Sequence, residues 1–227
     1  IQPLGFTLPS DITLDRLSRR VDLRALIDRH RSRLDPIPAV AKISFDQYYE
    51  QALSLIQTRR AAEAFRMDVE STATRERYGM TRFGQSLLLA RRLIEAGTRV
   101  VEVNWPKVAN SDNHSWDVHV GLSKRMKTQN SPMLDSGLSA LIGDLDERGL
   151  LDETLVIAGG EFGRSPKRGV STSGNVNSND GRDHWPHCYS VFLAGAGVKG
   201  GMTYGGTDGL GSNAVGRVVH VRDLHAT

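Results

Sequence analysis

The sequence predicts a layered α/β domain, in which helices pack against a sheet. The first hundred residues carry apolar side chains near helical spacing, and from about residue 98 onward helical stretches alternate with short β-branched runs. A stretch rich in Gly, Ser and Asn follows one of these runs. Alternation of helices and strands is typical of α/β domains, whose ligands collect where strands end and loops begin.

Three helices are predicted in the first hundred residues. From Asp15 to Leu34, apolar residues recur near a helical period between many arginines, and Phe45 to Ile56 shows a weaker form of the same pattern. The strongest pattern runs from Phe83 to Glu95. Gly97 is expected to end that helix, because glycine adopts the left-handed conformation found at many helix C-termini.

The second half of the chain alternates strands with a further helix. Thr98 to Asn104 is rich in β-branched residues and predicts a strand. An amphipathic helix follows and stops near Gly149, while Thr154 to Ala158 and Tyr189 to Leu193 predict two more strands. The apolar positions that mark the helix are Leu134, Leu138, Leu141, Ile142 and Leu145.

The composition suits one large domain or most of one. The chain has 227 residues, of which 39% are hydrophobic and 24% charged, as is ordinary for a soluble globular protein. Its net charge of +3 comes from scattered lysines and arginines, which argues against a nucleic-acid surface. Cys188 is the single cysteine, so an internal disulfide is excluded, and no apolar run approaches the roughly 20 residues that span a bilayer.

The two ends of the sequence suggest a larger fold. The chain starts at Ile1 without a leader, and residues 221–227 read as the first turn of a helix. We therefore expect residues 1–227 to form one partial domain, the C-terminal part of a longer chain. In it, residues 1–97 are mainly helical and residues 98–227 carry the site.

The first group of polar residues with chemical potential is the pair Asp117 and His119. In an extended segment, side chains two residues apart point to the same face, so these two can converge on one point. A carboxylate and an imidazole are common ligands of a divalent metal, but the pattern also fits a surface pair bonded to the backbone. His114, nearby in a polar stretch, fits a loop residue better than a ligand.

The second group lies at the start of the long loop from Gly159 to Asp183. Glu161 follows the strand predicted to end at Ala158, between glycines that let a backbone approach a ligand closely. A tight turn with a solvated carboxylate explains the same pattern. A loop of this length in a compact domain is usually a functional lid or a disordered segment.

The third and richest group combines Asp183, His184 and His187. Two histidines beside an acid suit metal binding or acid–base chemistry, and Pro186 favours an extended segment that would hold a ligand firmly. The alternative is a loop with one capping and one surface histidine. Nearby arginines and a lysine could face an anionic ester, or could be ordinary solvated charges. They are Arg164, Lys167, Arg168 and Arg182.

Motifs over nearly the whole chain resemble domain-of-unknown-function family 1501, which is abundant in planctomycetes and related bacteria. The most specific of them surround Glu161 and His184. The matching segments are ERYG at 76–79, FGQSLLLARRLIEAG at 83–97, WDVH at 116–119, GLLDETLVIAGGEFGRSP at 149–166, GRDHWP at 181–186 and LAGAGVKGG at 193–201.

The resemblance implies a three-layer α/β/α fold like that of alkaline phosphatases and sulfatases, and a metal-dependent hydrolase of phosphate or sulfate esters. The metal ligands would be Asp117, His119, Glu161 and His184, holding zinc, magnesium, manganese or calcium. In the superfamily an Asp-His-Gly sequence often follows a strand. Here Phe162 replaces its imidazole, which leaves room for a one-metal or rearranged site.

The same resemblance assigns further roles. The superfamily nucleophile, on an early strand, would lie before Ile1. Arg164 or Arg182 would hold a small anionic ester, or a phosphorylated or sulfated sugar, and His187 would support the ligands or act as an acid. The family usually carries a twin-arginine-type leader, which implies export to the periplasm or envelope. Two alternatives stay open: an exported binding or envelope module without catalysis, and a phosphomutase-type transferase.

Overall fold

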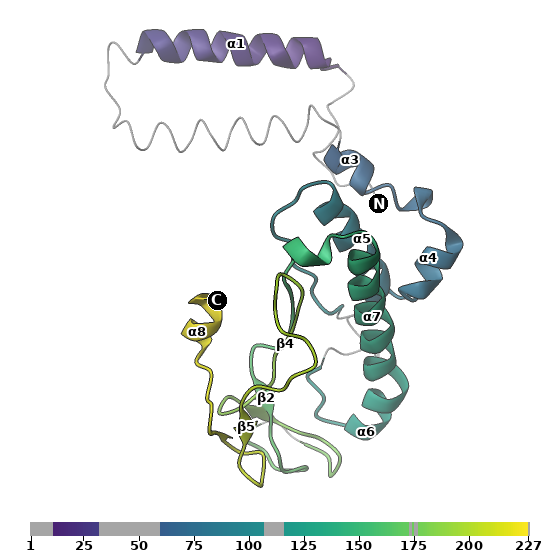
Figure 1. Ribbon diagram of the computed structural model, residues 1–227, viewed down its shortest axis with the longest axis vertical. Coiled ribbons are helices and arrows are strands. Elements are labelled where there is room, and N and C mark those ends of the chain that lie inside the picture. Colours follow the sequence, from purple (N-terminus) through teal and green to yellow (C-terminus); the bar gives the residue numbers. More distant parts are fainter. Residues whose placement is uncertain (1–10, 32–59, 107–115, 173, 175–176, 227) are drawn as a thin grey trace. The chain divides into compact units, whose positions relative to one another are not determined.

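The computed structural model of the chain describes residues 11–31, 60–106, 116–172, 174 and 177–226 (Figure 1). The chain divides into two compact units. One comprises Ile1–Ser71 with Arg92–Val101, and the other comprises Thr72–Arg91 with Glu102–Thr227. The prediction of one partial domain stays a prediction.

The first unit is helical in its described part. Helix α1 (Leu14–Arg31) confirms the predicted first helix as far as it is described, and α3 (Arg60–Ala64) and the 3-10 turn η1 (Met67–Val69) follow. The Arg92 guanidinium organises the last two elements, since its Nε donates to the Ala64 carbonyl at 2.7 Å and its NH1 pairs with the Glu70 carboxylate. The helix predicted from Phe45 to Ile56 lies outside the described residues.

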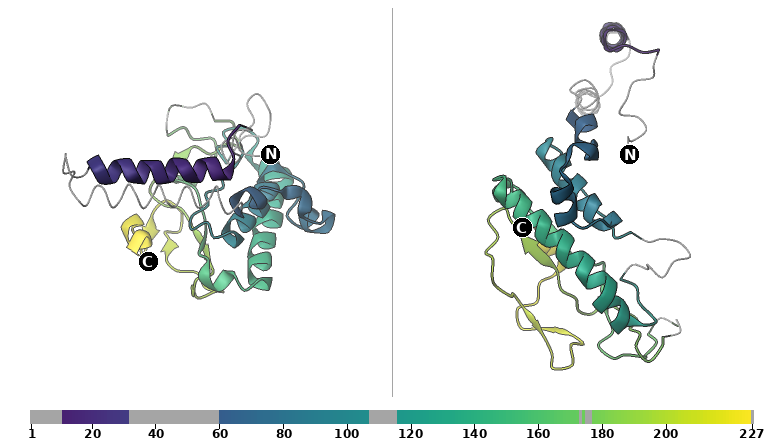
Figure 2. Two further views of the ribbon diagram at one scale, coloured as in Figure 1. Left: turned by 90° about the horizontal axis from the view of Figure 1, so that it is seen from above. Right: turned by 90° about the vertical axis from the view of Figure 1, so that its right-hand side faces the viewer.

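Helices of the second unit pack around small residues. They are α4 (Thr72–Arg77), α5 (Arg82–Glu95) with its residues 82–91, α6 (Leu122–Arg125), the π-helical turn η2 (Met126–Asn130) and α7 (Ser131–Glu147). Figure 2 shows α7 running beside α5. A Cβ added at Gly137 of α7 would lie 2.8 Å from Leu87 Cδ1 of α5, so the glycine permits this close approach.

The predicted helix ends are confirmed by their hydrogen bonds. Gly97 has φ +94°, and the Thr98 N–H bonds back to the Leu93 carbonyl at 2.9 Å. Gly149 repeats the arrangement at the end of α7, with φ +67° and a bond of 2.8 Å from Leu150 N to the Leu145 carbonyl. Both are Schellman caps, in which glycine takes the left-handed conformation that other residues avoid.

A buried ionic cluster joins α4, α5 and α7. The Asp144 carboxylate of α7 contacts Arg91 Nε at 2.9 Å, accepts the Tyr78 hydroxyl at 2.8 Å and accepts Arg148 Nε at 2.6 Å. Arg91 is 1% exposed and Asp144 is 4% exposed. Partners on several sides are required here, because an unpaired charge is costly to bury.

Strands of the described chain pair into three small antiparallel sheets. β1 (Val156–Ala158) pairs with β4 (Phe192–Ala194), opposing Ile157 to Leu193, and this confirms both predicted strands, although β1 begins two residues and β4 three residues later than predicted. The other pairs are β2 (Gly163–Arg164) with β3 (His184–Trp185), and β5 (Gly206–Thr207) with β6 (Ala214–Val215). The terminal helix α8 (Val221–Ala226) was also predicted.

The predicted strand from Thr98 to Asn104 is wrong. Its burial alternates as in a strand, with Val101 and Val103 half-buried and Glu102 and Asn104 exposed. No strand is assigned, however, because no ladder of backbone bonds joins residues 99–104 to another described segment. β-branched residues favour extended backbone, but only a pairing partner makes a strand.

The described residues therefore form a mixed α/β chain of helices and small antiparallel sheets. Within this part of the chain, none of the helices combines the length and apolar character needed to traverse a bilayer.

Candidate metal centre

Asp117 and His119 lie on a segment that neighbouring backbone fixes in place. Val118, between them, is fully buried, and its carbonyl accepts the Arg182 N–H at 3.3 Å. The His119 carbonyl accepts the Ser178 N–H at 3.0 Å. Because Val118 points into the interior, its two neighbours share the opposite, more accessible side, as the spacing of two predicts.

Gly181 makes this contact between the two segments possible. A Cβ at this position would lie 1.9 Å from the His119 carbonyl oxygen, closer than any side chain tolerates. The glycine of the GRDHWP motif is thus required for close backbone approach rather than for an unusual φ angle. It brings the segment of residues 117–119 against the strand that carries His184.

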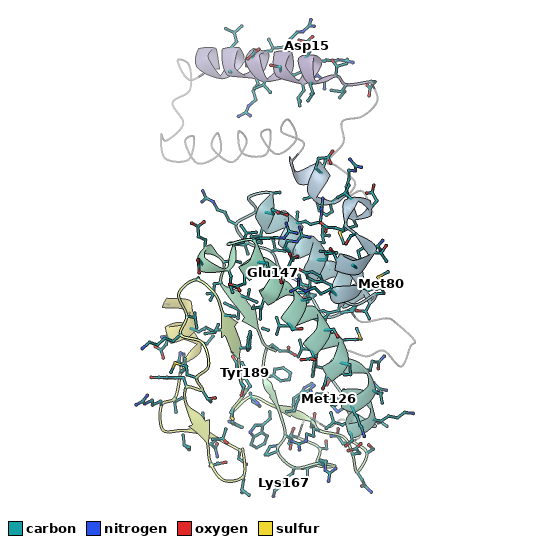
Figure 3. All side chains as sticks on the ribbon, turned by 45° about the vertical axis from the view of Figure 1, so that its right-hand side comes forward. Asp15, Met80, Met126, Glu147, Lys167 and Tyr189 are labelled. Atoms are coloured by element: carbon teal, nitrogen blue, oxygen red, sulfur yellow. The ribbon has the colours of Figure 1, made fainter. Side chains whose placement is uncertain are left out.

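His184 and Arg164 are cross-strand neighbours on β3 and β2. Beyond this pair the Ser165 N–H continues the contact, donating to the Asp183 carbonyl at 2.8 Å. Figure 3 shows the side chains on this end of the second unit, with Lys167 labelled in the loop after β2 and Met126 at the start of η2. The short β2–β3 pair therefore closes the base of the long loop and places an imidazole beside a guanidinium.

Three side chains converge on one oxygen of Asp117. Its Oδ1 lies 2.6 Å from Arg164 NH2, 2.8 Å from His119 Nε2 and 3.0 Å from His184 Nε2. The possible ligand atoms of Asp117, His119 and His184 all lie within 4.8 Å of one another. Among the described residues, this is the group of acids and histidines with the geometry to hold a metal ion.

The Asp117 carboxylate is ready to act as an anionic ligand. Partial burial acts to raise its pKa, but the hydrogen bonds from Arg164 and His184 outweigh burial and hold that pKa below its ordinary value. Its side chain is 51% exposed, against 18% for His119 and 33% for His184. The Asp117 carboxylate is therefore ionised at neutral pH, and the cluster is accessible from solvent on the carboxylate side.

His119 is held in one tautomer by the long loop. Its Nδ1 lies 2.7 Å from Asn177 Oδ1, and the Asn177 amide nitrogen donates to the Val170 carbonyl at 3.2 Å, which fixes the orientation of the amide. Nδ1 is therefore the nitrogen that donates to Asn177, and in the tautomer with its proton on Nδ1 the ring presents a lone pair at Nε2. An outer hydrogen bond of this kind is usual for a histidine that binds a metal.

Nε2 of His119 is a buried nitrogen without a hydrogen-bond partner in the described chain. It is close to Asp117 Oδ1, yet the contact does not have the alignment of a hydrogen bond. A buried nitrogen whose lone pair faces no hydrogen-bond donor is expected where that nitrogen binds a metal ion. The residues present fit a divalent cation held by two imidazoles and one carboxylate.

A family comparison covers almost the entire chain. The family model described as "Protein of unknown function (DUF1501)" matches residues 2–227. The chain belongs to the DUF1501 family. Comparison with curated proteins and with solved structures gave no match. The resemblance seen in the motifs is thus confirmed for the family itself, and the DUF1501 motifs WDVH and GRDHWP supply the three clustered residues.

Three other predicted site residues of this DUF1501 chain are not among the clustered ligand candidates. Glu161 is exposed in the turn before β2 and is not in the group of Asp117, His119 and His184. His187 is exposed and stacks edge-on against Trp185, with ring centroids 4.8 Å apart. Arg182 NH1 donates to the Ser165 carbonyl at 3.2 Å.

Phe162 lies against the DUF1501 cluster and contacts it through His184. Its ring centroid lies 4.7 Å from that of His184, with the planes tilted by 50°. The aromatic ring thus supports His184 by packing and offers no ligand atom.

Two residues of the DUF1501 site were not assigned a role from sequence. Asn177 lies in a loop of Gly, Ser and Asn, where nothing in the pattern distinguishes it. Asp183 was noted as an acid, but it is fully buried and holds backbone: its carboxylate accepts the N–H groups of Thr172 at 2.6 Å and His184 at 2.8 Å. Its position directly before His184 was the available signal.

Proposed function

We propose that this DUF1501 protein binds one divalent cation through Asp117, His119 and His184 and uses it to hydrolyse phosphate or sulfate esters. The observation that carries the proposal is the buried Nε2 of His119, which lies 2.8 Å from the ionised Asp117 but makes no hydrogen bond in the described chain, on a ring oriented by Asn177. An imidazole that a second residue holds in one orientation and one tautomer is suited to bind a metal ion.

The donor set favours zinc or manganese over magnesium or calcium. Two imidazole nitrogens and one carboxylate oxygen form a common catalytic zinc set, which leaves a position open for solvent or substrate. Imidazoles also suit other transition metals, and Mn²⁺ accepts mixed nitrogen and oxygen ligands. Calcium and magnesium prefer oxygen ligands throughout, so we rank them lower.

The chemistry then divides between the ion and the chain. A divalent ion would supply Lewis-acid chemistry, lowering the pKa of a water molecule or hydroxyl nucleophile and offsetting charge on the ester oxygens. Asp117 and the two histidines hold and orient it, and Phe162 restricts the space beside His184. Asn177 keeps the His119 proton on Nδ1.

The proposal extends to the alkaline phosphatase and sulfatase superfamily, with its three-layer fold, its nucleophile on an early strand and an exported location. Support comes from the order of the WDVH, GGEFGR and GRDHWP motifs. Glu161 would be an additional ligand only if the turn before β2 moved toward the cluster. The substrate would be a small anionic ester, or a phosphorylated or sulfated sugar.

A binding module without catalysis is the second candidate. The contact of Phe162 with His184 favours it, because hydrolysis with two ions would need a ligand where this ring stands. The two candidates share the metal and differ in turnover.

Metal content and ester turnover test the proposal together. We expect the purified chain to bind about one zinc or manganese ion, and His184→Ala, His119→Ala and Asp117→Asn to lose most of it, since three ligands are few. His220→Ala, an exposed histidine outside the cluster, is the control and should keep full occupancy. Equal metal content in all variants would remove the ligand assignment.

Turnover of aryl phosphate and aryl sulfate esters then separates the candidates. Hydrolysis that disappears on chelation and in His184→Ala supports the enzyme. Metal binding without turnover of either ester by the full-length parent supports the binding module.

A further inference from the structure

The Arg164 guanidinium contacts Asp117 Oδ1, the carboxylate oxygen that would bind a cation. Its NH2 lies 2.6 Å from Asp117 Oδ1, the same atom that both histidine nitrogens approach. The β2–β3 pairing sets Arg164 opposite His184, so the guanidinium and the imidazole reach the carboxylate side by side. In this state Arg164 neutralises Asp117 in place of a metal.

A divalent cation and this guanidinium cannot both remain at that oxygen. Two positive groups a few ångströms apart in a partly buried site repel strongly, because the local dielectric screens them less than water does. Asp117 and His119 are fixed by the buried Val118 between them, whereas Arg164 ends in a flexible side chain. The group that moves is therefore the guanidinium.

Arg164 also has unused hydrogen-bonding capacity. Its Nε is buried and has no hydrogen-bond partner among the described residues, and one of its two terminal nitrogens holds Asp117. A guanidinium presents Nε–H and N–H groups as a fork that matches two oxygens of a tetrahedral anion. Once released from Asp117, Arg164 would stand beside the cation with this fork free.

We infer that Arg164 couples the two halves of the site: cation binding displaces it from Asp117, and the displaced guanidinium completes a site for a tetrahedral oxyanion such as phosphate or sulfate. The inference rests on the proposed cation site. When no anion is present, Arg164 competes with the metal for Asp117. When an anion is bound, Arg164 and the metal hold that anion together. Because coupling is reciprocal, the anion must tighten cation binding by the same factor by which the cation tightens anion binding.

The experiment is a titration of the full chain with Mn²⁺, in chloride and then in sulfate at equal ionic strength. In wild type, sulfate should tighten Mn²⁺ binding by about tenfold, within the usual range for coupled sites. Arg164→Gln should bind Mn²⁺ more tightly than wild type in chloride, because the competitor is gone, and sulfate should add little. Arg168→Gln is the matched control: it removes the same charge from the loop, but Arg168 pairs with Asp180 at 3.5 Å and should behave as wild type.

Arg164→Lys tests whether the effects of Arg164→Gln come from loss of the guanidinium or from a general disturbance of the structure. Lysine keeps the positive charge but lacks the fork, so Mn²⁺ affinity in chloride should stay close to wild type while the gain from sulfate shrinks. The inference is overturned if Arg164→Gln binds Mn²⁺ no more tightly than wild type, or if sulfate tightens binding equally in both. Failure of wild type and every variant to bind Mn²⁺ would instead overturn the proposed cation site, and this inference with it.

Discussion

At the scale of single residues, the site depends on side chains that never touch the ion. Asn177 decides which nitrogen of His119 carries the proton, and Asp183 fixes the backbone at His184 through two short hydrogen bonds from N–H groups. Such outer partners affect metal affinity because a misoriented or wrongly protonated imidazole is a poor ligand. Their contribution can therefore be measured through the metal.

Asn177→Ala should weaken metal binding without removing it. Loss of the Oδ1 acceptor frees the His119 ring to rotate and to protonate at Nε2, so we expect affinity to fall about tenfold to a hundredfold. Asn177→Asp, which keeps an acceptor for the Nδ1 proton, should restore most of it. The measurement is a Mn²⁺ or Zn²⁺ titration, and unchanged affinity in Asn177→Ala would show that His119 is oriented by other contacts.

The sequence predicted the ligands of this cluster better than their supports. Asp117 and His119 were predictable because a spacing of two in extended backbone places side chains on one face, and His184 because it sits in a dense motif. Asn177 was not predictable, since a polar loop contains many equivalent amides and only the fold of the loop determines which of them lies beside His119. The pairing of Arg164 with Asp117 was missed for the same reason: it joins residues far apart in the sequence.

At the scale of elements, local signals predicted the long helices α1, α5 and α7 but not the short helices α3, α4 and α6, and they failed for one strand. The Schellman caps at Gly97 and Gly149 are determined by one residue and its near neighbours, so pattern and outcome agree. A strand depends on a partner elsewhere in the chain. The β-branched residues from Thr98 to Asn104 carry no information about such a partner, so the strand predicted there was wrong. β2 and β3, two residues each, carry no periodicity and were not predicted as strands.

Gly181→Ala should abolish the site while leaving the helices intact. The added Cβ would meet the His119 carbonyl at 1.9 Å, and backbone on both sides prevents either group from yielding cheaply. The segment of residues 117–119 should shift away from His184, and metal affinity should fall at least tenfold, since ligand geometry is lost. Metal titration measures the loss, and far-UV circular dichroism should stay near wild type.

Gly200→Ala is the control for this substitution. Its Cβ would meet nothing within 4 Å, and its φ lies outside the left-handed region, so the change tests glycine replacement without the clash. Wild-type affinity in Gly181→Ala would mean that the two segments separate easily and that their contact does not position the ligands.

At the scale of the whole molecule, acid should act on many carboxylates at once. In the part of the chain that the structure describes, the carboxylates whose pKa values depart from the ordinary are all shifted downward, toward the ionised form, by hydrogen bonds from folded partners. They are Asp117, Asp144, Glu147, Asp180 and Asp208. The unfolded chain lacks these partners, so it takes up protons at a higher pH than the native chain does.

The Asp144 cluster should dominate this acid response. Burial acts to raise the pKa of Asp144, but the hydrogen bonds from Arg148 and Tyr78 and the charge of Arg91 outweigh it and lower that pKa. A lowered native pKa means that the stabilisation is complete above the unfolded value of about 3.9 and is lost as the pH falls through the native pKa. The free energy of unfolding of the second unit should therefore fall steeply below about pH 4.

Substitutions at this cluster check the sign and the size of the effect. Asp144→Asn leaves Arg91 buried without its counter-charge and should cost about 3–5 kcal/mol at pH 7, while its stability should depend less on pH in the acid range. Tyr78→Phe is the milder variant: it removes one hydrogen bond to Asp144, should cost about 1–2 kcal/mol, and should move the acid transition to higher pH. Urea unfolding across the acid range measures both. If the stability of Asp144→Asn depends on pH as that of the wild type does, then exposed carboxylates, rather than this buried one, determine the pH at which the fold is lost in acid.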